Sequence, residues 1–292
     1  MHNNYFFLRK LAESLEDRFI GFSSEACFSQ NKDELILAFV KGPAEFWIRA
    51  DLKNQFSCLS FPDDFRRARK NSIDIFPEII GKSVTGIQTY AHERAFSIIL
   101  DHEINLLFKL FGNNSNALLY KDGRCVNVFK HDTGDENKID PGTLDRTIIS
   151  HEDDTGFTLD GLREMIPSFD KNILKYLESR GFNNSMNLKI KKDMVNDTLI
   201  LLDDPVFYVY PVKDTVKLSL LPGDLEARHF TDPVEALNYF YLEYHKLYWL
   251  NKEKGTLIRM LRKQLKKSKN YIANSKEKLE NLKTGGNFKQ YG

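Results

Sequence analysis

The sequence has little cysteine and no long apolar segment. Its three cysteines, Cys27, Cys58 and Cys125, are widely spaced and form no CxxC pair, which argues against a disulfide framework and against a zinc site. No run of about 18 apolar residues is present, and no charged start is followed by an apolar core, so we expect neither a membrane span nor a signal peptide. These absences predict a cytoplasmic protein with reduced thiols.

The motifs of common catalytic sites are also missing. Gly-Lys-Ser at 81–83 resembles the end of a phosphate-binding loop, but Phe76 stands where the first glycine belongs. His-Glu at 92–93 begins like a zinc-binding helix, but Phe96 replaces its second histidine. The seven histidines show no ligand spacing, and no serine lies in a nucleophile elbow. The sequence therefore predicts no enzyme, no metal site and no cofactor.

Charge is divided unevenly along the chain. Residues 252–283 carry eleven Lys or Arg and three Glu, whereas the 251 residues before them carry thirty basic and thirty-eight acidic side chains. Asp232, Pro233 and Glu235 have the pattern of an N-cap, a first-turn proline and a capping-box acid. We expect one helix from Asp232 to Lys283, about 75 Å long. A basic helix of this kind is half of a coiled coil, a polyanion-binding arm, or both.

Heptad spacing along this helix favours a coiled coil. One seam position is always apolar and is occupied by Ile258, Leu265, Ile272 and Leu279. The other is apolar half the time and is occupied by Leu261, Ser268, Ser275 and Leu282. The sequence contains no returning helix that could pair with this seam. We therefore expect the N-terminal part of a longer protein, with a homodimeric zipper as the alternative.

Hydrophobic periodicity predicts an α+β domain over residues 1–135 that is built from two similar units. A helix is expected from the helical spacing of Leu8, Leu11, Leu15 and Phe19. Three strands are expected in each unit, which in the first are 25–28, 34–40, and 45–48 together with 56–61. The same order recurs sixty residues later, with a second helix expected over Arg66–Ile80. We interpret this as a duplicated helix and β-sandwich domain, although chance agreement of the alternation is the alternative.

A polar connection at 131–156 precedes a predicted helical hairpin. Thr158 is expected to cap a helix that runs to Met165, and Ser168 a second helix that runs to Leu177. Hairpins of this kind can cradle nucleic-acid phosphates with backbone amides. The turn at 166–169 lacks the glycine that lets a phosphate approach, so a hairpin that only packs is the alternative.

A small β-hairpin is predicted next, with strands at 206–212 and 216–221. The complete division is therefore a sandwich domain at 1–135, a helix-hairpin-helix module with the β-hairpin at 136–231, and the first helix of a truncated coiled coil at 232–292.

Four segments carry a resemblance to a known family. They are the opening Asn4–Arg9, the strand pair at 28–37, the Glu-Arg pair at 93–94 before an apolar strand, and residues 108–119 with Gly112, Ser115 and Asn116. The chain resembles the N-terminal half of the NFACT proteins, ribosome quality-control factors long labelled fibronectin-binding proteins. The resemblance implies an N-terminal domain similar to that of formamidopyrimidine DNA glycosylases, a helix-hairpin-helix module and a long coiled coil.

This resemblance implies a non-enzymatic factor that binds the stalled large ribosomal subunit with its peptidyl-tRNA and nascent chain, recruits tRNA and promotes C-terminal alanine tailing. The family's paired Asp and Arg correspond to Glu93 and Arg94, and its early Asp to Asn4, so these residues are expected to bind tRNA. On the basic helix we expect rRNA binding by Arg259, Arg262, Lys263, Lys266 and Lys267. The missing C-terminal half of the same protein is a further expected partner.

Departures from the family pattern leave alternatives open. Asn4 lacks the family's charge, which favours a nucleic-acid-binding module without tailing activity as one alternative. Arg94 can meet a phosphate or a base, or it can pair with a neighbouring acid. A DNA glycosylase is disfavoured because that mechanism needs an N-terminal proline followed by Glu, where His2 and Asn3 stand here. A fibronectin-binding adhesin is disfavoured by the missing signal segment.

Overall fold

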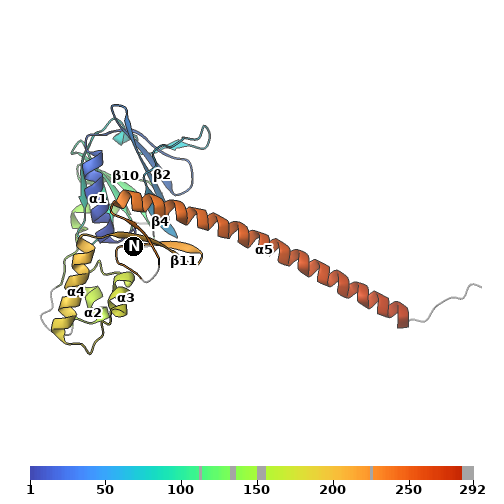
Figure 1. Cartoon of the computed structure of the whole chain (residues 1–292). Helices are drawn as coiled ribbons and strands as arrows, with labels where there is room; N and C mark the ends of the chain where they lie inside the picture. Colours follow the sequence, from blue (N-terminus) through green and yellow to red (C-terminus); the bar gives the residue numbers. More distant parts are fainter. Residues whose placement is uncertain (112–113, 132–135, 150–155, 224–225, 285–292) are drawn as a thin grey trace, which may run out of the picture. The chain divides into compact units, whose positions relative to one another are not determined.

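The structure, a computed structural model, describes the chain outside residues 112–113, 132–135, 150–155, 224–225 and 285–292 (Figure 1). It contains two compact units, Met1–Glu243 and Tyr244–Gly292. The three-part division at residues 135 and 231 stays a prediction. Gly112, which contributes to the family resemblance, lies outside the described residues.

The first unit begins with the expected amphipathic helix, α1 (Tyr5–Phe19). Asn4 caps it by accepting a hydrogen bond from the Phe6 amide. The residues at helical spacing are all buried, which confirms the sequence prediction. Phe19 contacts Phe39 of the first sheet, and α1 also contacts two strands of the second sheet. One apolar helix face thus serves both sheets.

Two antiparallel sheets of five strands each form most of the core. In spatial order the first contains β4 (Phe56–Ser60), β3 (Ala44–Lys53), β2 (Glu34–Lys41), β1 (Ser23–Ser29) and β5 (Ile73–Asp74). The second contains β10 (Arg124–Val128), β9 (Asn116–Lys121), β8 (Ile104–Lys109), β7 (Ala95–Leu100) and β6 (Val84–Thr89). The expected strands are confirmed, and each sheet has more strands than the three per unit that the sequence predicted.

The sixty-residue repeat is visible in the hydrogen bonds that join the two sheets. The Gly21 amide donates to the Val84 carbonyl at 2.8 Å, and the Gly81 amide donates to the Ser24 carbonyl at 2.7 Å. Each member of one bond is sixty residues from its counterpart in the other, so the two sequence repeats within the first unit meet across an approximate twofold axis. Both glycines have φ near +80°, a conformation that favours glycine over other residues.

The expected second helix over Arg66–Ile80 is wrong. This segment contains only the short edge strand β5 and the 3-10 helix η1 (Pro77–Ile79). Asn71 and Phe76 have positive φ, and Pro77 restricts the residue before it, so an α-helix cannot continue through the segment. Pairing of Ile73–Asp74 with β1 takes the place of the helix.

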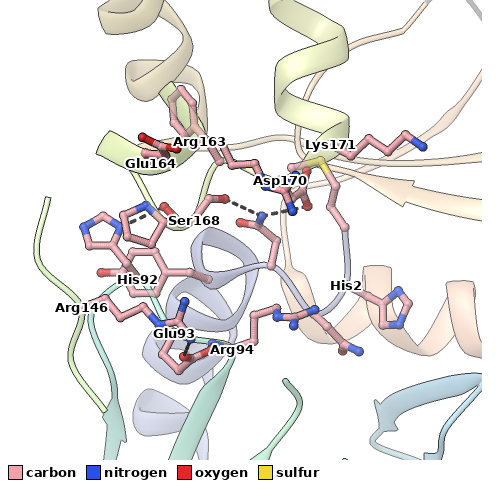
Figure 2. A pocket seen from close by; sticks show the side chains of 16 residues that line it. His2, His92, Glu93, Arg94, Arg146, Arg163, Glu164, Ser168, Asp170 and Lys171 are labelled. Atoms are coloured by element: carbon pink, nitrogen blue, oxygen red, sulfur yellow. Dashed lines mark hydrogen bonds and ion pairs between the residues drawn. The ribbon is translucent and has the colours of Figure 1, made fainter. Parts of the chain in front are cut away.

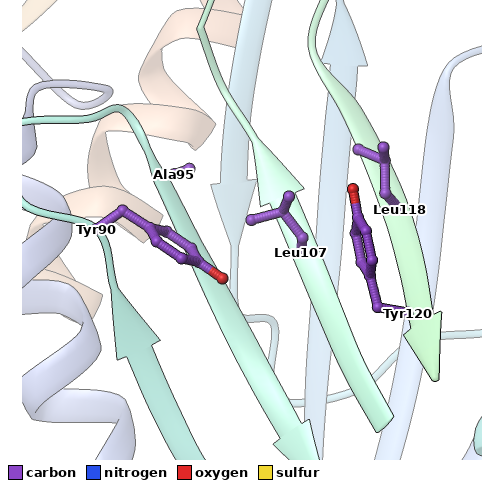
Figure 3. Packing of buried hydrophobic residues seen from close by; sticks show 5 residues of the cluster. All are labelled: Tyr90, Ala95, Leu107, Leu118 and Tyr120. Atoms are coloured by element: carbon purple, nitrogen blue, oxygen red, sulfur yellow. The ribbon is translucent and has the colours of Figure 1, made fainter. Parts of the chain in front are cut away.

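The outer face of the second sheet holds a cluster of buried residues: Tyr90, Ala95, Leu107, Leu118 and Tyr120 (Figure 3). Ile139 and Leu144 from the connection after β10 pack against it. The Tyr120 hydroxyl donates to the Ile139 carbonyl at 2.8 Å. This connection contains the 3-10 helices η3 (Glu136–Lys138) and η4 (Pro141–Thr143). Residues 136–144 of this connection are therefore held against the sheet.

Three helices and a small sheet complete the first unit. They are α2 (Leu159–Met165), α3 (Lys171–Ser179), α4 (Leu188–Asp203), β11 (Phe207–Val212), β12 (Thr215–Ser219) and β13 (Arg228–Phe230). The Thr158 cap and the β-hairpin are confirmed. The expected Ser168 cap is wrong, because the Asp170 carboxylate accepts from the first amides of α3 while the Ser168 hydroxyl is bonded elsewhere.

The long C-terminal helix is also confirmed, as α5 (Pro233–Thr284). The Asp232 carboxylate accepts from the amides of Val234 and Glu235, as its N-cap position predicted. The first turns of α5 belong to the first unit, where Phe240 and Tyr241 are buried. From Tyr244 onward the helix belongs to the second unit. Among the described residues, every helix is too short or too polar to cross a membrane.

Candidate functional site

A cavity of about 620 Å³ lies in the first unit, between the start of α1, the turn before β7 and the α2–α3 turn (Figure 2). It brings together the three residues expected to bind tRNA, Asn4, Glu93 and Arg94, although ninety residues separate the first from the last. The sequence did not predict that the helical hairpin would line the same cavity. Its contribution includes Arg163, Ser168 and Asp170.

Asn4 is buried, and its side chain holds the cavity wall together. Its carbonyl oxygen caps α1, while its amide nitrogen donates to the Ser168 carbonyl and to an Asp170 carboxylate oxygen, both at 3.0 Å. The two donated bonds require an amide, because an ionised carboxylate has no hydrogen to donate. Asn4 therefore ties the first helix to the α2–α3 turn, and its role in tRNA binding stays a prediction.

Glu93 is buried and carries an ion pair that the sequence did not predict. One carboxylate oxygen accepts from the Arg94 amide at 2.7 Å, and the other lies 2.5 Å from an Arg146 guanidinium nitrogen. Figure 2 shows the two side chains next to each other. Arg146 reaches this position because its amide donates to the Ala91 carbonyl at 2.8 Å, beyond the connection that packs on the second sheet. No local sequence signal indicates that contact.

Arg94 is exposed at the cavity, and its guanidinium makes no ion pair within the described residues. The neighbouring acid, Glu93, pairs with Arg146 instead. The alternative, an ion pair between Arg94 and a neighbouring acid, is therefore absent among the described residues. Arg163 and Lys171 are likewise exposed at the cavity without an ion pair to any described residue. Three cations can thus meet an anionic ligand.

His92 links the turn before β7 to the hairpin. It has a φ of 56°, its Nδ1 lies 2.8 Å from the Ser168 hydroxyl oxygen, and its ring centroid lies 4.9 Å from that of Tyr5. Partial burial, with a smaller effect from the charge of Arg9, lowers the pKa of His92. A neutral imidazole at pH 7 is therefore favoured, and it adds no positive charge to the cavity.

The amides at the start of α3 are already used. The Asp170 carboxylate accepts from the amides of Asn172 at 2.8 Å and of Ile173 at 3.2 Å. Hairpins that cradle a phosphate do so with free amides at such a turn. This occupancy favours a packing hairpin, so an anion in the cavity would be met by side chains.

The five residues expected to bind rRNA lie in the second unit, and all are exposed on α5. Their spacing of three and four residues places Arg259, Arg262, Lys263, Lys266 and Lys267 along one side of the helix. The apolar seam residues are exposed as well, from 38 % for Ile258 to 74 % for Leu282. No cluster of metal-ligating side chains occurs in the part of the chain that the structure describes.

No family model matches the sequence, and no curated protein matches it. Several solved structures are similar in fold, among them the following three. A fibrinogen-binding protein from Staphylococcus aureus has a TM-score of 0.62 at 13 % identity, with 82 % of this chain and 99 % of that chain covered. The N-terminal part of a fibronectin/fibrinogen-binding protein from Streptococcus suis has a TM-score of 0.54 at 13 % identity, with coverages of 82 % and 98 %.

The N-terminal domain of the fibronectin-binding protein PavA from Streptococcus pneumoniae has a TM-score of 0.50 at 14 % identity, with 82 % of this chain and 98 % of that chain covered. At such identities these similarities establish a shared fold. The fold is thus a mixed α and β arrangement of antiparallel sheets that ends in a long helix, as in the N-terminal regions of fibronectin-binding proteins.

Proposed function

We propose that this protein is a cytoplasmic, non-enzymatic RNA-binding factor of the NFACT type. It contacts tRNA at the cavity and the large ribosomal subunit with the basic side of α5, and it acts on stalled subunits that hold a nascent chain. We also propose that residues 1–135 form a β-sandwich domain that resembles the N-terminal domain of formamidopyrimidine DNA glycosylases.

The observation that carries the proposal is the position of Arg94. Glu93, the buried acid directly before Arg94, is placed to neutralise it, but here Arg146 pairs with that acid and Arg94 stays exposed. A guanidinium can bind a phosphate through two parallel hydrogen bonds or stack on a base. With Arg163 and Lys171 at the same cavity, the site has the chemistry of a phosphate-binding surface.

Replacing Arg94 tests this proposal. Arg94→Ala removes a charge-assisted contact, so tRNA affinity should fall about ten- to a hundredfold. Arg94→Lys should recover part of the affinity, because an ammonium cannot bind in the bidentate way. The matched control is Arg124→Ala, which removes an exposed arginine of β10 outside the cavity and should leave tRNA affinity unchanged. Filter binding or fluorescence anisotropy with labelled tRNA measures these affinities.

Thermal melting of the same variants provides the second measurement. Since Arg94 has no internal ion pair among the described residues, Arg94→Ala should melt within about two degrees of the wild type. A variant that melts much earlier yet binds tRNA normally would contradict the proposal and make Arg94 a structural residue.

Asn4 bears on alanine tailing, because it replaces the family's acid and its side chain makes internal hydrogen bonds. Incorporation of labelled alanine into nascent chains on purified stalled subunits measures it directly. Binding without incorporation would support a nucleic-acid-binding module that does not tail.

Binding of fibronectin or fibrinogen is the second candidate, favoured by the descriptions of the three similar structures. Surface plasmon resonance with immobilised fibronectin and fibrinogen tests it. Saturable binding that Arg94→Ala does not change, together with no tRNA binding, would favour this candidate over the RNA-binding factor.

A further inference from the structure

An exposed aromatic cluster lies at the start of the second unit. The ring centroids of Tyr248 and Trp249 are 5.7 Å apart in an edge-to-face arrangement, and the rings of Tyr244 and Tyr248 stack at 6.3 Å. Lys252 places its Nζ 4.3 Å from the indole centroid. Tyr248 is 47 % exposed and Trp249 is 53 % exposed. Large aromatic side chains left in solvent together are typical of binding surfaces.

Helix geometry puts these aromatic residues on the same side of α5 as the basic residues. Eighteen residues make about five complete turns, so Tyr248 lies in line with Lys266, and Trp249 lies in line with Lys267. The separation along the helix axis is about 27 Å. Between Lys254 and Lys276 the sequence has no acidic residue, so the cations on this side are not neutralised along the helix. We call this side of α5 the aromatic-basic face.

A coiled-coil partner would not cover this face. Trp249 stands nine residues before Ile258, which is about two and a half turns, so the two side chains point to opposite sides of the helix. A helix that packs along the seam of Ile258 and Leu265 therefore leaves the indole in solvent. The exposed aromatic pair needs an occupant that is also attracted to the adjacent cations.

We propose that the aromatic-basic face binds an unpaired stretch of RNA, with a base stacked on Trp249 and phosphates held by the lysines and arginines along the helix. This inference rests on the proposed function and names the form of RNA that α5 recognises. Cations alone would bind duplex and single strand alike, whereas an aromatic ring can stack only on a base whose face is free. Since every base has such a face, the recognition should depend little on sequence.

Intrinsic fluorescence of the whole chain tests the proposal. The chain has two tryptophans, so a Trp47→Phe variant makes Trp249 the sole reporter. Titration with a twelve-nucleotide oligouridylate should quench its emission, and a twelve-base-pair RNA duplex should not. Anisotropy with labelled RNA should show Trp249→Ala binding the single strand about five- to a hundredfold more weakly, with duplex affinity unchanged.

The matched control is Leu250→Ala, which removes an apolar side chain of similar exposure, 60 %. Leu250 is the next residue after Trp249, so its side chain is turned about 100° around the helix axis from the indole. It should bind both RNAs as the wild type does. Equal single-strand affinity for Trp249→Ala and the wild type would overturn the inference, while retained tRNA and ribosome binding would leave the proposed function in place. A wild-type chain that binds neither the two test RNAs nor tRNA and the large ribosomal subunit would overturn both. Loss of self-association in Trp249→Ala during sedimentation, with RNA affinity unchanged, would identify a protein contact and reject the RNA site.

Discussion

Asn4→Asp restores the acid of the NFACT pattern, and the structure predicts that it destabilises this protein. Asp caps a helix about as well as Asn, so the bond from the Phe6 amide should survive. The amide nitrogen of Asn4 donates two further bonds, to the Ser168 carbonyl and the Asp170 carboxylate. These two bonds are lost in Asn4→Asp, because an ionised carboxylate has no hydrogen to donate. The introduced carboxylate would also repel the Asp170 carboxylate, at about the 3.0 Å that now separates the hydrogen-bonded Asn4 and Asp170 side chains.

The magnitude follows from these contacts. An orphaned buried acceptor such as the Ser168 carbonyl costs about 1–3 kcal/mol. Two carboxylates 3.0 Å apart repel by about 1.4 kcal/mol in water and about 5.5 kcal/mol at an effective dielectric constant of 20. Asp170 is half-buried, so a value near the lower limit applies, about 2 kcal/mol. We expect a loss of about 3–5 kcal/mol at pH 7.

The loss should depend on pH. Repulsion raises the pKa of the introduced carboxyl above its value in the unfolded chain, so stability is present below about pH 4 and is lost as the pH rises through the folded-state pKa. Asn4→Ala removes the cap, at about 1 kcal/mol, and the same donor bonds, but adds no charge. Asn4→Asp should therefore be the more stable variant at pH 4.5 and the less stable one at pH 7.5.

Urea unfolding followed by tryptophan fluorescence at several pH values measures these free energies. The double variant Asn4→Asp with Asp170→Asn exchanges donor and acceptor, so at pH 7 it should recover the repulsion, about 2 kcal/mol, while the Ser168 carbonyl still lacks its donor. If Asn4→Asp is as stable as the wild type at pH 7, or if the order of the two single variants does not change with pH, the assignment of the Asn4 bonds is wrong.

Two further predictions concern the basic helix and the N-terminal histidine. Changing Lys263, Lys266 and Lys267 to Glu should weaken cosedimentation with the large ribosomal subunit and flatten its salt dependence, because each phosphate contact releases counterions; equal binding and equal slope would refute the rRNA contact. Burial, and the nearby N-terminal amine, lower the pKa of His2 to about 3. The unfolded chain therefore binds the proton first as the pH falls below about 6.5, and about 1–2 kcal/mol of stability should be lost between pH 7 and pH 5. His2→Gln should remove that part of the pH dependence, and an unchanged pH profile would contradict it.

Local patterns determined those parts of the fold that depend on neighbours in the chain. The helical spacing from Leu8 to Phe19 fixed α1, because one apolar face must be buried whichever surface receives it. Asp232 and Pro233 located the start of α5 because capping depends on residues within one turn. The sixty-residue repeat predicted two similar sheets, since equal alternation buries equal faces.

Residues 66–80 show where local patterns fail. Their apolar spacing is compatible with a helix, but Ile73–Asp74 gains backbone hydrogen bonds at the open edge of β1. An edge strand needs a partner from elsewhere in the chain, so no local pattern could indicate it.

The site was decided by tertiary structure for the same reason. The sequence selected Asn4, Glu93 and Arg94 through a resemblance, without showing that they share a cavity. Whether Arg94 is available depends on Arg146, which reaches Glu93 because the connection before it packs on the second sheet. An ion pair between residues more than fifty positions apart is set by packing, and packing is a property of the folded chain.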